Sequence, residues 1–175
     1  MRTMPSQPRL ILVIGGARSG KSTYAEALLA AFPPPWIYVA TAEAFDDEMR
    51  ARIAHHRARR DERWQTIDAP LTLPEAVRQL DGRGEPILVD CLTLWLSNCL
   101  LGGLDVEEAG DRLVSAIAAA RVPVVLVSNE VGWGIVPDTP LGRQFRDAQG
   151  RLNQKVAAIA DRVVMMVAGV PLTVK

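Results

Sequence analysis

The chain has 175 residues, 49% of them hydrophobic, and its 20 lysines and arginines balance 20 aspartates and glutamates. This length and hydrophobic content indicate a single globular domain over residues 1–175, and zero formal net charge argues against a nucleic-acid partner, which favours a basic excess. The two cysteines, Cys91 and Cys99, are too few for a disulfide framework or a zinc site, so we expect reduced packing thiols.

The first predicted element is a strand over residues 9–14, an apolar run that ends at Gly15 and Gly16. This run is too short to be the core of a signal peptide. No other stretch of the chain is long enough to span a membrane. We therefore expect a cytoplasmic protein.

Helices and strands alternate after this first strand, which predicts a single-domain α/β fold with a mostly parallel sheet and helices on both faces. In such sheets ligands bind beyond the carboxyl ends of the strands. This rule predicts that the ligand-binding loops are those after Ile14, Ala40, Asp90 and Ser128. In chain order we predict a helix over 21–31, a strand over 36–40, a helix over 45–60, a strand over 65–67, a helix over 73–80, a strand over 86–90, helices over 92–100 and 106–120, a strand over 122–127, a loop over 129–140, a long helix from Leu141, and two strands, 162–167 and 172–174, joined by a turn at 169–171.

A phosphate-binding loop (P-loop) is predicted directly after the first strand. The pattern G-x-x-x-x-G-K-[ST] lies here between a buried strand and a helix, which is the context that it requires. Successive backbone N–H groups would cradle phosphate oxygens, Lys21 would reach the β- and γ-phosphates, and Ser22 would ligate Mg²⁺. The alternative is a glycine-rich turn that caps an ordinary helix. The motif consists of Gly15, Gly16, Ala17, Arg18, Ser19, Gly20, Lys21 and Ser22.

Asp90 ends the apolar strand predicted over residues 86–90. P-loop enzymes keep at such a strand end the acid that orients magnesium, so we predict that Asp90 and Ser22 hold the metal ion together. The alternative is that Asp90 is the N-cap of the helix that begins near Leu92, since aspartate caps helices well.

The two histidines, His55 and His56, are adjacent on the charged helix predicted over residues 45–60. His56 falls within the apolar stripe of this helix and is expected to be packed and partly buried. His55 points to the other side, near Arg52 and Arg59, whose positive charges favour a neutral imidazole. A neutral imidazole can attack an α-phosphate and carry a nucleotidyl group. The alternative is a solvated charged face with an incidental histidine.

Five segments, spread in order over nearly the whole chain, carry further motifs, and several of these motifs are not general features of P-loop proteins. The segments are GGARSGKS (15–22), YVATAEAFDDEMRARIAHHRARR (38–60), LVDCLTLWLSNCL (88–100), VSNEVGWGIVPDTPLGRQFRDAQGRLNQ (127–154) and VAAIADRVVMMVAGVPLTVK (156–175). Together they resemble the adenosylcobinamide kinase/adenosylcobinamide-phosphate guanylyltransferase family.

This resemblance implies two reactions. In the first, ATP or GTP phosphorylates the aminopropanol hydroxyl of adenosylcobinamide. In the second, GMP from GTP is carried on the first histidine of the HH pair, here His55, and is transferred to adenosylcobinamide phosphate, which gives adenosylcobinamide-GDP. The resemblance also implies a P-loop fold of the recombinase type and a homo-oligomer, a trimer.

The nucleotide contacts of the family map onto the P-loop and onto three further groups of residues. The first group follows the second strand, the second follows His55, and the third consists of acids at strand ends. The family commonly has a glutamate at one of these acidic positions, where this chain has Asp68. The residues are Thr41, Ala42 and Glu43; His56, Arg57, Ala58 and Arg59; and Asp68 and Asp90.

The loop over residues 129–137, which contains Glu130, Gly132 and Gly134, is open to two interpretations. It is either part of the corrinoid or nucleotide site, or a structured connection that needs glycine for positive φ. Two alternative functions also stay open. One is a plain small-molecule kinase whose histidines are structural, and the other is a nucleotide-dependent regulatory module.

Overall fold

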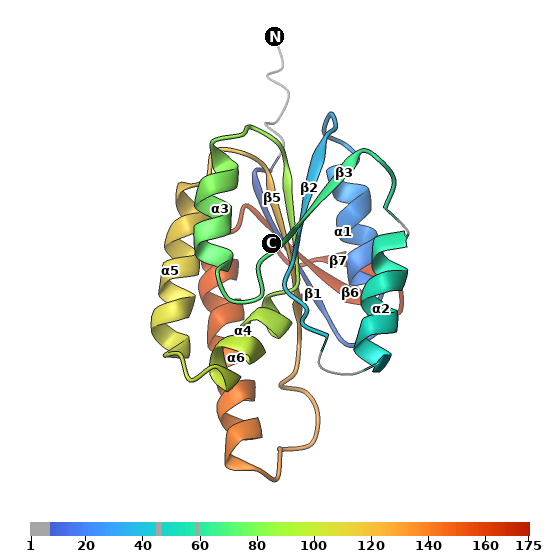
Figure 1. Ribbon diagram of the computed structural model, residues 1–175. Helices are drawn as coiled ribbons and strands as arrows, with labels where there is room; N and C mark the ends of the chain where they lie inside the picture. Colours follow the sequence, from blue (N-terminus) through green and yellow to red (C-terminus); the bar gives the residue numbers. More distant parts are fainter. Residues whose placement is uncertain (1–7, 45–46, 59) are drawn as a thin grey trace.

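Seven strands form one sheet in the computed structural model of the chain, which describes residues 8–44, 47–58 and 60–175 (Figure 1). The strands are β1 (Leu10–Gly15), β2 (Trp36–Ala40), β3 (Trp64–Asp68), β4 (Ile87–Asp90), β5 (Val124–Asn129), β6 (Arg162–Val167) and β7 (Val170–Thr173). Their order across the sheet is β3-β2-β4-β5-β1-β6-β7. All neighbouring strands are parallel except β6 and β7, so the predicted mostly parallel sheet is confirmed.

The antiparallel β6–β7 hairpin differs from the sequence prediction at its turn. The turn consists of Ala168, with a φ of 51°, and Gly169, with a φ of 82°. Positive φ at both central residues gives a turn whose twist matches that of a hairpin. Val170 and Pro171 therefore belong to β7, and the prediction that they form the turn was wrong. Edge strands accept proline, as this one does, because one side of their backbone needs no partner.

Helices cover both faces of the sheet, as predicted (Figure 1). One face carries α1 (Lys21–Leu29) and α2 (Asp47–Ala58), and the other carries α3 (Leu73–Asp81), α4 (Leu92–Leu101), α5 (Val106–Ala119) and α6 (Pro140–Ile159). In α2 the structure describes the backbone alone at residues 48, 49, 52 and 55. Among the described residues, no helix combines the length and the apolar character that crossing a bilayer requires.

The interior strand β1, which lies between β5 and β6, separates two hydrophobic cores. Leu10 and Leu12 pack in the core beneath α3, α4, α5 and α6, whereas Ile11 and Val13 pack in the core beneath α1. Strand side chains alternate between faces, so a strand buried on both sides must be apolar at every position. Burial of each of these side chains stabilises the fold by about 1.5–3 kcal/mol. The continuous apolar run in the sequence follows from this position inside the sheet, with a core on each face.

Thr41 joins the carboxyl ends of β2 and β4. It is fully buried, and its hydroxyl donates to the carbonyl of Cys91 (2.7 Å) and accepts from the Cys91 N–H (2.8 Å). The side-chain amide of Asn98 in α4 donates to the Thr41 carbonyl (2.8 Å). These contacts satisfy polar groups that would otherwise be costly to bury. They fix the sheet edge beyond which the predicted ligand-binding loops lie.

Candidate functional site

The loop between β1 and α1 has the conformation of a phosphate cradle. Gly20, with a φ of +90°, and Arg18, with a φ of +56°, adopt left-handed conformations that curl the chain into α1. Gly20 has no side chain that could cap α1, so the N–H groups of the first turn are available to an anion. Lys21 is 8% exposed, and its Nζ donates to the Gly16 carbonyl at 2.5 Å. The ammonium group is thus held against the P-loop.

Three neighbouring segments support the P-loop. A Cβ atom on Gly15 would lie 2.7 Å from the Met166 carbonyl oxygen, so only glycine allows this approach to β6. The Glu130 N–H donates to the Gly15 carbonyl (3.1 Å), and the Gly169 N–H donates to the Ser19 carbonyl (3.0 Å). The loop after β5 and the β6–β7 turn therefore both fix the P-loop.

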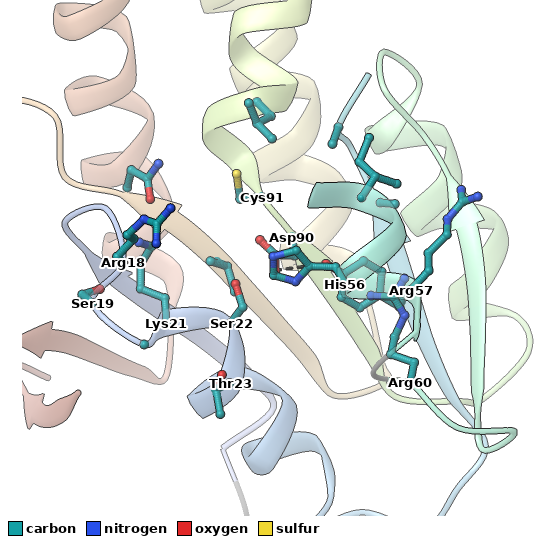
Figure 2. Close-up of a pocket in the computed structure, with 18 of the residues that line it drawn as sticks. Arg18, Ser19, Lys21, Ser22, Thr23, His56, Arg57, Arg60, Asp90 and Cys91 are labelled. Atoms are coloured by element: carbon teal, nitrogen blue, oxygen red, sulfur yellow. Dashed lines mark hydrogen bonds between the residues drawn. The ribbon is translucent and has the colours of Figure 1, made fainter. Parts of the chain in front are cut away.

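The C-terminal half of α2 forms the wall opposite the P-loop (Figure 2). Ile53, His56 and Arg57 line this wall. Arg57 Nη2 donates to both carboxylate oxygens of Asp68 at the end of β3, at 2.8 and 2.9 Å. This ion pair is exposed, so it contributes modestly to stability, but it connects the end of α2 to the sheet. The backbone of His55 lies in α2, whereas its side chain, like residue 59, lies outside the described part of the chain.

Asp90 lies between the two walls and interacts with Tyr38 (Figure 2). The Tyr38 hydroxyl donates to Asp90 Oδ2 at 3.0 Å. Burial, and then the negative charge of Asp90, raise the pKa of Tyr38 far above its usual value, so the hydroxyl remains a donor. The N-cap residue of α4 is Cys91, so Asp90 does not cap this helix. The capping alternative for Asp90 is therefore excluded.

A cavity of about 590 Å³ lies between these walls. Such a volume is typical of pockets for nucleotide-sized ligands. Its lining comes from the P-loop, from α2 and the segment after it, and from the carboxyl ends of several parallel strands. The lining residues are Arg18, Ser19, Gly20, Lys21, Ser22, Thr23, Tyr38, Ala40, Ala42, Ile53, His56, Arg57, Arg60, Asp68, Asp90, Cys91, Leu94, Val127 and Asn129.

Ser22 and Asp90 bring a hydroxyl and a carboxylate to this cavity. Within the described residues, no three histidines, cysteines or acids gather as a metal-binding cluster. Magnesium in nucleotide sites takes one or two protein oxygens and obtains its remaining ligands from phosphates and water. The oxygen donors of Ser22 and Asp90 fit a magnesium ion of this kind.

The cavity brings together most, but not all, of the residues predicted from the sequence. Ten of them line it: Arg18, Ser19, Gly20, Lys21, Ser22, Ala42, His56, Arg57, Asp68 and Asp90. Gly15, Gly16, Ala17, Thr41, Glu43 and Ala58 do not line it. The first three of these are P-loop backbone positions, and Thr41 turns its hydroxyl to the backbone of Cys91. His55 and Arg59 lie where the structure describes no side chain.

Sequence reasoning missed Tyr38, Arg60 and Leu94, which also line the cavity. Alternation along β2 would have indicated Tyr38, because it lies two residues before Ala40, at the strand's carboxyl end. Arg60 has no comparable signal. Its position depends on the Tyr38 ring, whose centroid lies 3.7 Å from the Arg60 Cζ atom.

The loop between β5 and α6 extends from the same edge of the sheet as the P-loop (Figure 1). Neither Gly132 nor Gly134 has a positive φ, so the proposed structural reason for these glycines was wrong. Arg143 Nη1 donates to the carbonyls of Pro137 and Asp138, both at 2.9 Å, which fixes the loop on α6. Three apolar side chains in this loop are largely exposed: Trp133 (80%), Ile135 (97%) and Val136 (63%).

A buried polar network holds the root of this loop in place. Gln149 and Asn153 of α6 both bond to Ser128: the Gln149 amide donates to the Ser128 hydroxyl (2.9 Å), which donates to Asn153 Oδ1 (2.6 Å). The Asn153 amide then donates to the Asn129 carbonyl (3.1 Å), and the Asn129 N–H donates to Thr93 Oγ1 (2.8 Å). Because these groups bond to one another inside the fold, α6 and α4 together fix where β5 ends.

The chain is similar to known proteins over nearly its whole length. Residues 11–174 match a family model described as cobinamide kinase / cobinamide phosphate guanyltransferase. The chain is 45% identical to the bifunctional adenosylcobalamin biosynthesis protein CobP of Pseudomonas aeruginosa, over 94% of this chain and 96% of that protein. It is 42% identical to the bifunctional adenosylcobalamin biosynthesis protein CobU of Escherichia coli K12, over 95% of this chain and 99% of that protein.

Solved structures of secretion ATPases share the fold. A prototypical ATPase from the type III secretion system of pathogenic bacteria superposes with a TM-score of 0.55 and 12% identity, over 90% of this chain and 50% of that chain. The ATPase EscN of enteropathogenic Escherichia coli gives the same TM-score and identity, over 91% of this chain and 43% of that chain. The present chain thus spans about half the length of these ATPases or less. The likeness concerns the fold alone, and it confirms the predicted α/β fold of the P-loop, recombinase-like type.

Proposed function

This chain belongs to the cobinamide kinase/cobinamide phosphate guanyltransferase family, and on that premise we propose that both reactions take place in the cavity beyond the P-loop. Family membership makes the protein an adenosylcobinamide kinase and adenosylcobinamide-phosphate guanylyltransferase of adenosylcobalamin biosynthesis. The plain-kinase and regulatory alternatives are thereby set aside. The observation that carries the proposal is a single cavity lined both by the P-loop and by the helix that bears His55.

In the kinase reaction, we propose that the P-loop holds the triphosphate of ATP or GTP. The first-turn amides of α1 and the Lys21 ammonium lie where they can bind the β- and γ-phosphates. The aminopropanol hydroxyl of adenosylcobinamide then displaces the nucleoside diphosphate from the γ-phosphorus. Ser22 and Asp90 would hold Mg²⁺, which neutralises phosphate charge when bound.

In the guanylyltransferase reaction, we propose that the His55 imidazole attacks the α-phosphorus of GTP. A nitrogen–phosphorus bond forms, and pyrophosphate leaves. A phosphate oxygen of adenosylcobinamide phosphate then attacks the same phosphorus, the imidazole leaves, and adenosylcobinamide-GDP is released. His56 and Arg57, the next two residues of α2, line the cavity, which supports a position of this helix segment beside the nucleotide.

We further propose that the corrin macrocycle lies against the exposed apolar side chains of the loop after β5. A cavity of about 590 Å³ suits a nucleotide, so the much larger corrinoid needs surface outside it. Trp133, Ile135 and Val136 provide exposed apolar surface, which marks interaction sites on proteins. The loop begins at Asn129, which lines the cavity, and Glu130 bonds to Gly15 of the P-loop. A corrinoid on this surface would lie close to bound phosphates.

The histidine assignment is tested by incubating the protein with GTP labelled at the α-phosphorus. The unmodified protein and His56→Ala should form an acid-labile, base-stable adduct, whereas His55→Ala should form none and keep most of its kinase activity. Phosphoryl transfer at a P-loop needs no histidine, so the two activities should separate. Lys21→Ala should impair both activities if one cavity serves both. Loss of both activities in a folded His55→Ala variant would contradict the separate roles.

A further inference from the structure

Arg60 follows α2 and places a guanidinium group at the edge of the cavity. Two of its nitrogens, Nε and Nη1, are buried and have no hydrogen-bond partner among the described residues. Arginine rarely buries nitrogen atoms without a partner, because the loss of hydration is costly. Arg57, which also lines this wall, differs in that its guanidinium already binds Asp68.

The ring of Tyr38 fixes this guanidinium in place. The Arg60 Cζ atom lies 3.7 Å from the ring centroid, within the range of a cation–π interaction. Tyr38 is 5% exposed, and its hydroxyl is bonded to Asp90. Trp64 packs against the Tyr38 ring edge to face, with the centroids 6.3 Å apart. Arg60 is therefore positioned by a rigid support before any ligand binds.

We propose that Arg60, held on the Tyr38 ring, is a second phosphate-binding group of the cavity, in addition to the P-loop. A guanidinium group presents planar N–H donors that match phosphate oxygens, and its charge strengthens these hydrogen bonds. The P-loop and Arg60 line opposite sides of the same cavity (Figure 2). No protein group in the described part of the chain competes for Nε and Nη1 of Arg60, so its guanidinium group is available to a phosphate in the cavity.

Either of two phosphates in the guanylyltransferase reaction could bind to Arg60. The choice between them rests on the proposed function. One belongs to the guanine nucleotide, and the other is the phosphate of the acceptor, adenosylcobinamide phosphate. The kinase acceptor is a neutral hydroxyl, so a group that binds the acceptor phosphate acts in the second reaction alone. A group that binds the nucleotide instead affects GTP binding in both reactions.

The test compares Arg60→Gln and Arg60→Lys with a matched control, Arg63→Gln. Arg63 also stacks on an aromatic ring, with its Cζ atom 4.9 Å from the Trp36 centroid, but it is paired with Asp61 and does not line the cavity. Three quantities are measured for each folded variant: the Kd for GTP, the KM for adenosylcobinamide in the kinase reaction, and the KM for adenosylcobinamide phosphate in the transfer reaction. The thermal unfolding midpoint shows whether each variant is folded.

We expect Arg60→Gln to weaken one phosphate-dependent step on the order of 10-fold or more, and Arg60→Lys to recover part of the loss. A raised KM for adenosylcobinamide phosphate alone assigns Arg60 to the acceptor, and a raised Kd for GTP assigns it to the nucleotide. If folded Arg60→Gln behaves like Arg63→Gln in all three measurements, the inference is wrong. If the unmodified protein forms no adduct and transfers no GMP, the proposed function fails instead.

Discussion

The surroundings of a single residue, Cys91, determine how reactive its thiol is. This thiol is buried beside Asp90, and burial, followed by the negative charge of Asp90, raises its pKa to about 11. Burial also raises the pKa of Cys99 to about 11. A thiol with so high a pKa is almost entirely protonated at neutral pH and is a poor nucleophile. The cavity therefore contains a sulfur atom that is chemically inert under ordinary conditions.

The raised thiol pKa values predict a loss of stability at alkaline pH. An unfolded cysteine has a pKa of about 8.5, so the folded state holds these protons more tightly. The resulting stabilisation is complete below that value and is lost as the pH rises toward about 11, by about 3 kcal/mol for each thiol. The free energy of unfolding, measured with urea from about pH 7.5 to about pH 10.5, follows this loss.

Replacement of both cysteines by alanine is the control, because tyrosines and lysines titrate in the same range. The doubly substituted protein should show a flatter dependence of its unfolding free energy on pH. A thiol reagent should also find no fast-reacting group in the folded protein near neutral pH. Rapid modification of Cys91 under those conditions would contradict the raised pKa.

Among the residues of the site, those that the sequence predicts are the ones that belong to a local motif or end a strand. The P-loop and Asp90 follow from a motif and from a strand end, and the structure brings Lys21, Ser22 and Asp90 to one cavity. Arg60 has no such signal, and only alternation along β2 indicates Tyr38. Their roles depend on a ring and a guanidinium that meet across 22 positions of sequence and two separate elements, and only the fold brings them within 3.7 Å of each other.

Among the elements, the loop after β5 is fixed at both ends by hydrogen bonds, while its apolar side chains stay exposed. Its root is tied to the P-loop through Glu130 and to α6 through the buried amides of Gln149 and Asn153. Its far end is fixed by Arg143. A Cβ atom on Gly142 would lie 2.8 Å from Pro137 Cβ, so glycine is needed where the loop meets the helix. A preformed surface binds its ligand with little loss of conformational entropy.

Trp133→Ala should therefore weaken corrinoid binding without changing nucleotide binding. Loss of an exposed aromatic contact raises the KM for adenosylcobinamide about 10-fold, while the Kd for GTP and the melting temperature stay constant. Steady-state kinetics of the kinase reaction measure the KM. Leu104→Ala, which removes an apolar side chain 49% exposed outside this loop, is the matched control. Equal KM values for both variants would place the corrinoid elsewhere.

Most elements could be predicted from the sequence, because buried parallel strands appear in it as continuous apolar runs between helices. β2 was predicted with its observed ends, Trp36–Ala40, since proline precedes it and polar residues follow. The turn before β7 was misplaced, because glycine and proline near one another resemble a turn. The actual turn uses Ala168 in a left-handed conformation, which alanine rarely adopts and composition does not reveal.

At the scale of the whole molecule, one edge of the sheet presents apolar surface to solvent. The exposed side chains belong to β7 and its flanks: Val167 (54%), Val170 (65%), Leu172 (59%) and Val174 (64%). Exposed apolar edge strands favour association with another chain. This surface supports the prediction of a homo-oligomer, and we expect a second copy of the chain to cover it.

Sedimentation equilibrium should accordingly give a mass that is a multiple of 19.1 kDa, and three times that value for a trimer. Leu172→Lys should shift the protein toward the monomer, because a charge at a buried apolar contact costs several kcal/mol. Leu104→Lys, at an exposed site between α4 and α5, should leave the mass unchanged. A monomer at all concentrations would contradict the oligomer, and an unchanged mass for Leu172→Lys would place its interface elsewhere.

The contact between Gly169 and Ser19 has a consequence for how the protein is made. Chains leave the ribosome N-terminus first, and domains fold as their residues emerge. The P-loop emerges early, but β5 and β6, which flank β1, and the turn that fixes the Ser19 carbonyl come last. A nascent chain therefore contains the complete nucleotide motif long before it can hold a nucleotide. Substrate cannot guide the early stages of folding, and only the finished protein is stabilised by binding it.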